Sequence, residues 1–183
     1  MRAAGTRPRG RLVERIWFGS RLAALPLLPL SVAFWVVSTL RRLAYRWGIL
    51  SSERLPVPVI VVGNLTVGGA GKTPLVIWLA RHLRDRGIRA GVLSRGYGGS
   101  ARTFPLAVTP ATDPGLVGDE PVLIARRTGC PVVVDPDRAR GGRWLLGNAA
   151  CDLLVADDGL QHYRLARDLE IVVIDGERRF GDG

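Results

Sequence analysis

Lysine is nearly absent from this chain: Lys72 stands alone, and every other Lys or Arg position is arginine. Cysteine is also scarce, with Cys130 and Cys151 the two examples, each just before an apolar run. Neither has the spacing of a metal or redox motif, which argues against a disulfide framework and favours buried thiols of a cytosolic protein. The chain also lacks internal repeats and low-complexity tracts, so a repeat architecture is not expected.

The positive charge of the chain is unevenly distributed. The net charge is +10 over 183 residues, but residues 1–54 contain ten arginines against Glu14 and Glu53, a local balance of +8. The remaining 129 residues therefore carry only +2. Because the basicity belongs to one end of the chain, it is not the footprint of a nucleic-acid-binding domain, and we expect no nucleic-acid partner.

The basic N-terminal segment also contains a long uncharged stretch. Residues 22–40 have no charged side chain and would be just long enough to span a bilayer as a helix. Pro26 and Pro29 interrupt the first half, and from Ser31 onward the pattern becomes amphipathic. A helix packed on its own domain, a true span and a secretory signal are the alternatives. We favour an anchor at an anionic membrane surface, formed by residues 1–54.

The next part of the chain has the pattern of a phosphate-binding loop. An apolar, β-branched run at residues 59–62 leads into a glycine-rich turn at 63–71 and then into a helical pattern. Glycines let backbone N–H groups close around phosphate oxygens, lysine reaches the β- and γ-phosphates, and a threonine hydroxyl ligates Mg²⁺. The predicted nucleotide-binding residues are Thr66, Val67, Gly68, Gly69, Ala70, Gly71, Lys72 and Thr73.

One residue departs from the usual phosphate-loop pattern. Thr66 occupies the position that normally holds the first glycine, so a glycine-rich surface turn is the alternative interpretation. The strand before the turn, the helix after it and the Gly-Lys-Thr sequence favour nucleotide binding. The retention of Lys72 in so arginine-rich a chain indicates that a compact ammonium charge is needed there.

Strand and helix patterns alternate through residues 55–183. We expect strands at 59–62, 89–94, 106–109, 131–134, 153–156 and 171–174, and helices at about 73–86, 118–128 and 137–146. This alternation predicts an α/β fold of the P-loop NTPase type, with a mainly parallel sheet and helices on both faces. Few residues follow the last strand, so we expect the domain to be truncated before a second, C-terminal domain.

Charged residues follow two of the expected strands, and an acidic pair opens one of the expected helices. The strand at 153–156 ends in Asp157 and Asp158, as in the Walker B element whose carboxylate holds Mg²⁺ directly or through water. Arg95 follows another strand, at the edge where open α/β sheets bind ligands. Asp119 and Glu120 open a helix; they could be ordinary helix-start acids or could supply a base and a Mg²⁺ ligand.

Several motifs occur together in a fixed order. They read Gly-Asn-Leu-Thr-Val-Gly-Gly-Ala-Gly-Lys-Thr-Pro, Ser-Arg-Gly-Tyr-Gly-Gly, Gly-Asp-Glu-Pro and Asp-Asp-Gly-Leu-Gln-His, after an apolar basic leader. From about Trp17 to Gly183 this combination closely resembles the tetraacyldisaccharide 4′-kinase family, the lipid A 4′-kinases of Gram-negative bacteria. Thr66 in place of the first glycine matches that family.

The resemblance implies transfer of the ATP γ-phosphate to the 4′-hydroxyl of a tetraacyldisaccharide 1-phosphate, a lipid A precursor, at the cytoplasmic face of the inner membrane. It implies ATP and Mg²⁺ as cofactors, and a second domain whose histidine works with the base. Each of these roles falls on a matching position: Asp119 as the base, Thr73, Glu120 and Gln161 as the Mg²⁺ set, and Asp157 and Asp158 as Walker B carboxylates. Arg95 and His162 are further candidates for substrate contacts.

Two other classes of protein remain as alternatives at this point. A membrane-targeted regulatory ATPase of the partitioning type shares Gly-Gly-x-Gly-Lys-Thr, but that family has a lysine directly before its glycine pair, where this chain has Val67. The other class is a non-catalytic nucleotide-binding anchor. The sequence indicates neither the oligomeric state nor the preferred acyl chains.

Overall fold

The computed structural model describes residues 28–64 and 71–174, which fall into two units, the first ending at Ile49 and the second beginning at Leu50. The first contains helix α2 (Leu28–Arg46), none of whose side chains is buried. Pro29 lies in the first turn of this helix, where its missing N–H has no intrahelical partner to lose, so it does not interrupt the helix. Within the described ranges, no helix is both long and apolar enough to cross a bilayer.

The second unit is an α/β domain built on a six-stranded sheet with the strand order β3-β4-β2-β5-β1-β6. All neighbouring pairs are parallel except β3 with β4, which confirms the predicted mainly parallel sheet. In chain order, its elements are β1 (Val59–Asn64), α3 (Lys72–Arg84), β2 (Ala90–Ser94), β3 (Leu106–Val108), α4 (Pro114–Val117), α5 (Asp119–Thr128), β4 (Val132–Val134), α6 (Arg138–Asn148), β5 (Leu153–Asp157) and β6 (Leu169–Val173).

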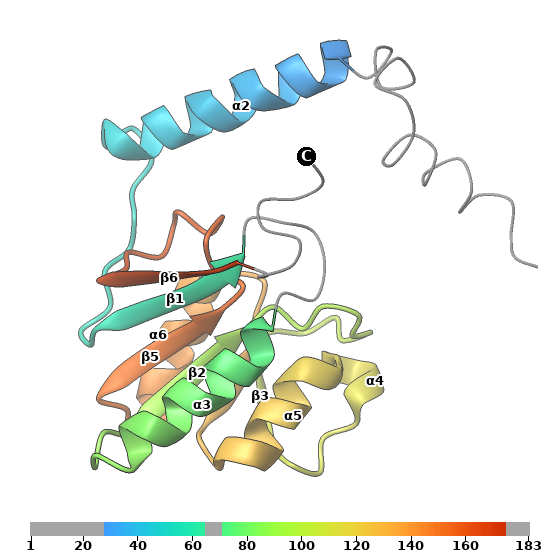
Figure 1. Ribbon diagram of the computed structural model, residues 1–183, viewed down its shortest axis with the longest axis vertical. Coiled ribbons are helices and arrows are strands. Elements are labelled where there is room, and N and C mark those ends of the chain that lie inside the picture. The colour runs from blue at the N-terminus through green and yellow to red at the C-terminus, as the bar shows by residue number, and fades with distance from the viewer. Residues whose placement is uncertain (1–27, 65–70, 175–183) are drawn as a thin grey trace, which may run out of the picture. The chain divides into compact units, whose positions relative to one another are not determined.

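Helices cover both faces of the sheet, as expected. Helices α3 and α5 lie on one face and α6 on the other (Figure 1). Alternate residues of β1 serve the two layers, because successive side chains of a strand point to opposite faces: Val62 joins the α3–α5 core, and Val61 joins the α6 core. Both cysteines are free thiols, with Cys151 buried and Cys130 partly exposed.

The structure differs from the sequence expectations before α5 and at the start of β6. The sequence predicts no helix between the strand at 106–109 and the helix at 118–128, but this segment contains the short helix α4. Asp113 caps this helix by accepting a hydrogen bond from the Gly115 N–H at 2.8 Å, and Pro114 follows at its first position. Strand β6 starts two residues earlier than expected, because Leu169 already pairs with Ile60 of β1.

The strand order brings four loops to one edge of the sheet. Strands β4, β2, β5 and β1 are parallel neighbours, so their carboxyl ends lie along the same edge. Ligands of open α/β sheets bind at this edge. Most residues expected to bind nucleotide, metal and substrate follow the ends of β1, β2 and β5 in the chain, whereas Asp119 and Glu120 begin α5, which follows β3 and α4.

Candidate functional site

The described part of the phosphate-binding loop lies beside the end of β5. Strand β1 pairs directly with β5, and Val62 is in register with Asp157. Gly71 precedes α3 in the left-handed conformation (φ 77°), which glycine adopts without strain. Five of the predicted nucleotide-binding residues lie outside the described residues: Thr66, Val67, Gly68, Gly69 and Ala70.

The ammonium group of Lys72 is held at the ends of β1 and β5. Its Nζ donates to Asn64 Oδ1 at 2.8 Å and to Asp158 Oδ1 at 2.7 Å. The Lys72 side chain is 17% exposed, so this charge is largely shielded from water. Asp158 adopts φ 54°, a conformation that is unusual for a residue other than glycine. The lysine is thus oriented toward the strand ends by two oxygen acceptors.

Asp157 is a buried carboxylic acid with an uncommitted oxygen. The residue is 2% exposed, and its Oδ1 makes no hydrogen bond within the described residues. Burial, together with the negative charges of Glu120 and Asp158, raises the pKa of Asp157 to about 6, although Lys72 and Arg138 oppose the shift. A buried oxygen of this kind calls for a bound cation or water, and the Asp157 site is therefore suited to a metal directly or through water.

This burial predicts a pH-dependent gain in stability for Asp157→Asn. The carboxyl pKa rises from 3.8 to about 6 on folding, so protonation favours the folded state. The protonated carboxyl of Asp157 makes its full contribution to the free energy of unfolding below about pH 4, and this contribution is lost as the pH rises through 6. Since asparagine is neutral throughout, we expect the variant to be about 1–3 kcal/mol more stable than wild type above pH 7. The difference should vanish toward pH 4.

Urea denaturation without nucleotide or divalent cations measures this difference. Asp152→Asn is the matched control, because Arg89 holds the pKa of exposed Asp152 down to about 2 and the control should show no gain at neutral pH. An Asp157→Asn effect that stays constant from pH 4 to 8, or has the opposite sign, would contradict this account.

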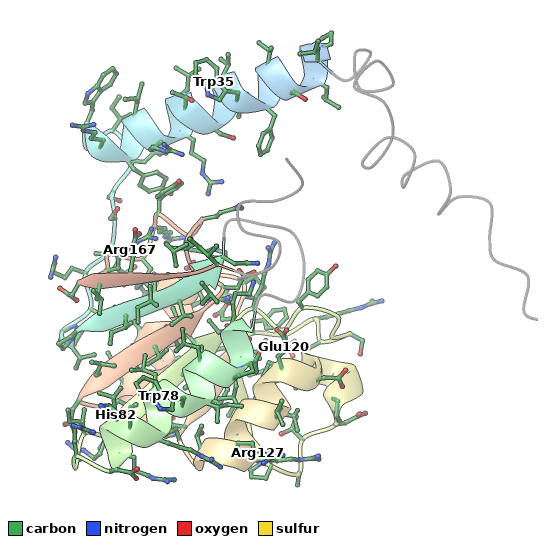
Figure 2. All side chains as sticks on the ribbon, viewed as in Figure 1. Trp35, Trp78, His82, Glu120, Arg127 and Arg167 are labelled. Carbon is green, nitrogen blue, oxygen red and sulfur yellow. The ribbon has the colours of Figure 1, made fainter. Side chains whose placement is uncertain are left out.

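Asp119 and Glu120 line one pocket with Thr73. The pocket has a volume of about 300 Å³ and is also lined by Pro114, Val122, Leu123 and Arg126. Figure 2 shows Glu120 at the start of α5, near the first turn of α3. Neither acidic side chain makes a hydrogen bond or ion pair with another described residue, and the residue before α5 is Gly118, which provides no side-chain cap. Their carboxylates are therefore available to a ligand.

Close backbone packing fixes the start of α5. Gly118 has φ 88°, and a side chain there would collide with the carbonyl oxygen of Tyr97. The loop that begins with Arg95 thus packs directly on the turn before Asp119. This contact joins two of the sequence motifs and holds Asp119 at the pocket.

The remaining expected residues surround the end of β5. His162 is half-buried, and burial lowers its pKa to about 4, helped by the charges of Arg138 and Arg95, so it is neutral at physiological pH. Arg95 and Gln161 are exposed. The described residues contain no cluster of three His, Cys, Asp or Glu side chains. A Mg²⁺ site formed by Thr73, Glu120 and Gln161 needs no such cluster, because bound Mg²⁺ usually keeps several waters and uses only one or two carboxylates. This ligand set remains a prediction.

Three residues at this site were not expected from the sequence. Asn64 accepts from Lys72, and its position at the end of β1, directly before the glycine-rich turn, was an available signal. Arg138 and Arg167 reach the Asp157–His162 segment through backbone carbonyls. Such contacts leave no pattern in a single sequence, because a backbone carbonyl accepts a hydrogen bond whatever the side chain of its residue is.

Comparisons with known proteins agree on one family. The family model for tetraacyldisaccharide-1-P 4′-kinase (LpxK) matches residues 23–183. The tetraacyldisaccharide 4′-kinase of Nitrosococcus oceani is 54% identical over 171 residues, 93% of this chain and 51% of the relative. The enzyme of the same name from Actinobacillus succinogenes is 54% identical over 167 residues, 91% of this chain and 51% of the relative.

A solved structure gives the same result for the fold. The "apo" form of LpxK from Aquifex aeolicus, in complex with ATP, matches with a TM-score of 0.74 and 39% identity. The match covers 80% of this chain and 47% of that chain. The chain spans about half the length of the curated relatives it matches. These matches do not support a regulatory ATPase of the partitioning type, and the chain belongs to the tetraacyldisaccharide 4′-kinase family.

Proposed function

We propose that the protein containing this chain transfers the ATP γ-phosphate to the 4′-hydroxyl of a tetraacyldisaccharide 1-phosphate. The observation that carries this proposal is the grouping at one end of the domain: the oriented Lys72 ammonium, the uncommitted Asp157 oxygen and the carboxylates that share a pocket with Thr73. The names of the relatives and the ATP in the matched Aquifex aeolicus structure support the same reaction.

The residues present fit ATP and Mg²⁺. The uncommitted, buried Asp157 oxygen and the Thr73 and Glu120 side chains around one pocket are hard oxygen donors, the type that Mg²⁺ prefers. Thr73, Glu120 and Gln161 would hold the ion, with Asp157 reaching it directly or through water. When bound, Mg²⁺ neutralises charge on the β- and γ-phosphates. Lys72 would contact the same phosphates through its ammonium group.

Asp119 would accept the proton of the acceptor hydroxyl. As the 4′-oxygen forms its bond to the γ-phosphorus, the bond from that phosphorus to the bridging oxygen of ADP breaks, and the hydroxyl proton passes to the Asp119 carboxylate. Glu120, the next residue, is directed differently on the helix and so can serve the metal while Asp119 serves the acceptor. Arg95 and His162 would contact the substrate.

The test of this activity is ATP turnover by the full-length protein with and without the lipid acceptor. We expect turnover to require the tetraacyldisaccharide 1-phosphate and to stop when the acceptor already bears a 4′-phosphate. A regulatory ATPase or a nucleotide-binding anchor would show turnover independent of the acceptor, or none. Equal ATP consumption with both lipids would contradict the proposed function.

The N-terminal segment is proposed to hold the protein at the cytoplasmic face of the inner membrane. Helix α2 leaves large apolar side chains exposed, among them Phe34 at 71% and Trp35 at 66%. Its second half carries Arg41, Arg42 and Arg46, within the segment of net charge +8. An amphipathic helix of this kind binds the interface through apolar burial together with attraction to anionic lipids.

Deletion of residues 1–49 should release the protein from anionic vesicles. Each arginine near such a surface contributes about 1 kcal/mol, and salt screens this contribution. Co-sedimentation with vesicles that contain anionic lipid and with vesicles that lack it, at low and high salt, measures the effect. Equal pelleting of the intact and deleted proteins would refute the anchor.

A further inference from the structure

Arg138, the first residue of α6, ties together two strands that are not neighbours. Its side chain is almost completely buried, at 2% exposure. Nη1 donates to the Asp135 carbonyl after β4, and Nη2 donates to the Asp157 carbonyl at the end of β5, each at 2.8 Å. Because β2 lies between β4 and β5, the guanidinium spans the end of the central strand. Its Nε has no partner within the described residues.

Arg167 holds the same segment from the other side. Its Nη1 donates to the Leu160 carbonyl at 3.0 Å and approaches the Gly159 carbonyl at 3.4 Å. The side chain is 13% exposed and pairs with Glu170 of β6 at 2.9 Å. Its guanidinium also lies 5.5 Å from the ring centre of Tyr163. Figure 2 shows Arg167 beside β6.

The turn between the two arginines is the one that directs Asp158 toward Lys72. Asp158 is in the left-handed conformation, and the Gly159 N–H donates to the Val62 carbonyl at 3.3 Å. Leu160 occupies the space that a side chain on Gly63 would need, so the turn rests on the first glycine of the phosphate-loop region. The strained residue persists because its surroundings determine its backbone.

We propose that Arg138 and Arg167 form an arginine clamp whose role is to position the Asp157–Leu160 turn, and with it both carboxylates, for the metal and the phosphates. The clamp rests on the proposed function. The two guanidinium groups bind three backbone carbonyls of that turn, at residues 157, 159 and 160. A buried arginine with an unpaired Nε is a poor choice for stability alone, since an apolar side chain of similar volume would avoid the desolvation penalty. The presence of arginine at this buried position indicates that hydrogen bonds must be donated to the turn in fixed directions.

The test compares Arg167→Met and Arg138→Met with wild type in the full-length protein. Mn²⁺ serves as the probe: its affinity for the protein–ADP complex is read by electron paramagnetic resonance, alongside kcat, KM for ATP and amide exchange of the turn. We expect metal affinity and kcat to fall about 10–100-fold, with KM changing much less. Amide exchange at Gly159 should accelerate, because its N–H bond to Val62 depends on the position of the turn.

Conservative variants and a control separate positioning from plain stability. Arg167→Lys keeps the pair with Glu170 and should recover part of the activity, whereas Arg138→Lys should recover less, because one ammonium does not reproduce a planar fork. Arg89→Met is the control; it removes an exposed ion pair with Asp152 at 2.5 Å, before β2 and β5. The control should retain wild-type metal affinity.

Each outcome decides a different claim. Lower melting temperatures with unchanged Mn²⁺ affinity, kcat and amide exchange would overturn the clamp and leave both arginines as structural residues. Failure of wild type to bind Mn²⁺ with nucleotide would instead contradict the proposed function. The clamp would then be tested by amide exchange alone: faster exchange at Gly159 in the variants would support it, and unchanged exchange would overturn it. If Arg138→Met does not fold, Arg167→Met alone tests the clamp, because Arg167 lies outside the central strands, two residues before the edge strand β6.

Discussion

Lys72→Ala is expected to lower kcat/KM for ATP by about 10²–10³-fold in the full-length protein. This is the typical effect of removing one preorganised hydrogen-bond donor that stabilises negative charge in the transition state. The chain has no other lysine, and the Lys72 ammonium is held by Asn64 and Asp158 at the ends of adjacent strands. The measurement is steady-state kinetics, with nucleotide affinity determined separately by calorimetry.

Two matched variants define what the Lys72 result means. Lys72→Arg keeps the charge but should not restore activity, because a planar guanidinium does not fit the place of a compact ammonium held by two oxygens. Arg89→Ala removes an exposed cation elsewhere and should leave kcat/KM near the wild-type value. A folded Lys72→Ala protein with normal affinity and turnover would refute the phosphate-loop assignment.

Asp119→Ala is expected to lower turnover by about 10²–10⁴-fold while leaving ATP affinity nearly unchanged, because a positioned base acts on the acceptor and not on the nucleotide. The carboxylate lines the pocket shared with Thr73 and has no structural partner among the described residues. Its removal should therefore have little effect on the free energy of unfolding. Steady-state kinetics together with thermal melts measures both quantities.

Glu120→Ala is the neighbouring comparison for that experiment. Loss of a metal ligand should raise the Mg²⁺ concentration needed for activity as well as lower the rate. If the two acids only stabilised the start of α5, each substitution would lower stability by about 1 kcal/mol or less and spare catalysis. Wild-type turnover in a destabilised Asp119→Ala protein would remove the base assignment.

The sequence allowed most of the fold to be predicted, because each buried strand is a short β-branched run between turn residues. The run at residues 59–62, for example, became β1, with alternate side chains in the two cores. Helix α4 was missed because its four residues, from Pro114 to Val117, are too few to show a helical period. The start of β6 was missed because Leu169 and Glu170 do not continue an apolar run, and pairing with β1 extends the strand there.

The site was predictable where residues lie within motifs and hidden where they act through the backbone. Lys72 and Asp157 were identified from a strand–loop–helix pattern and an apolar strand ending in acids. The different environments of Asp157 and Asp158, one buried with an uncommitted oxygen and the other paired with Lys72, come from the turn that Arg138 and Arg167 hold. No local sequence pattern predicts the hydrogen bonds that these two arginines donate to the backbone of the turn.

The most direct test of the account is transfer of label from γ-³²P-ATP to the lipid acceptor by the full-length protein. In the presence of Mg²⁺, wild type should form a labelled product that carries its new phosphate on the 4′-oxygen, and Lys72→Ala should form almost none. Label released as inorganic phosphate at the same rate with or without the tetraacyldisaccharide 1-phosphate, with no labelled lipid, would contradict it.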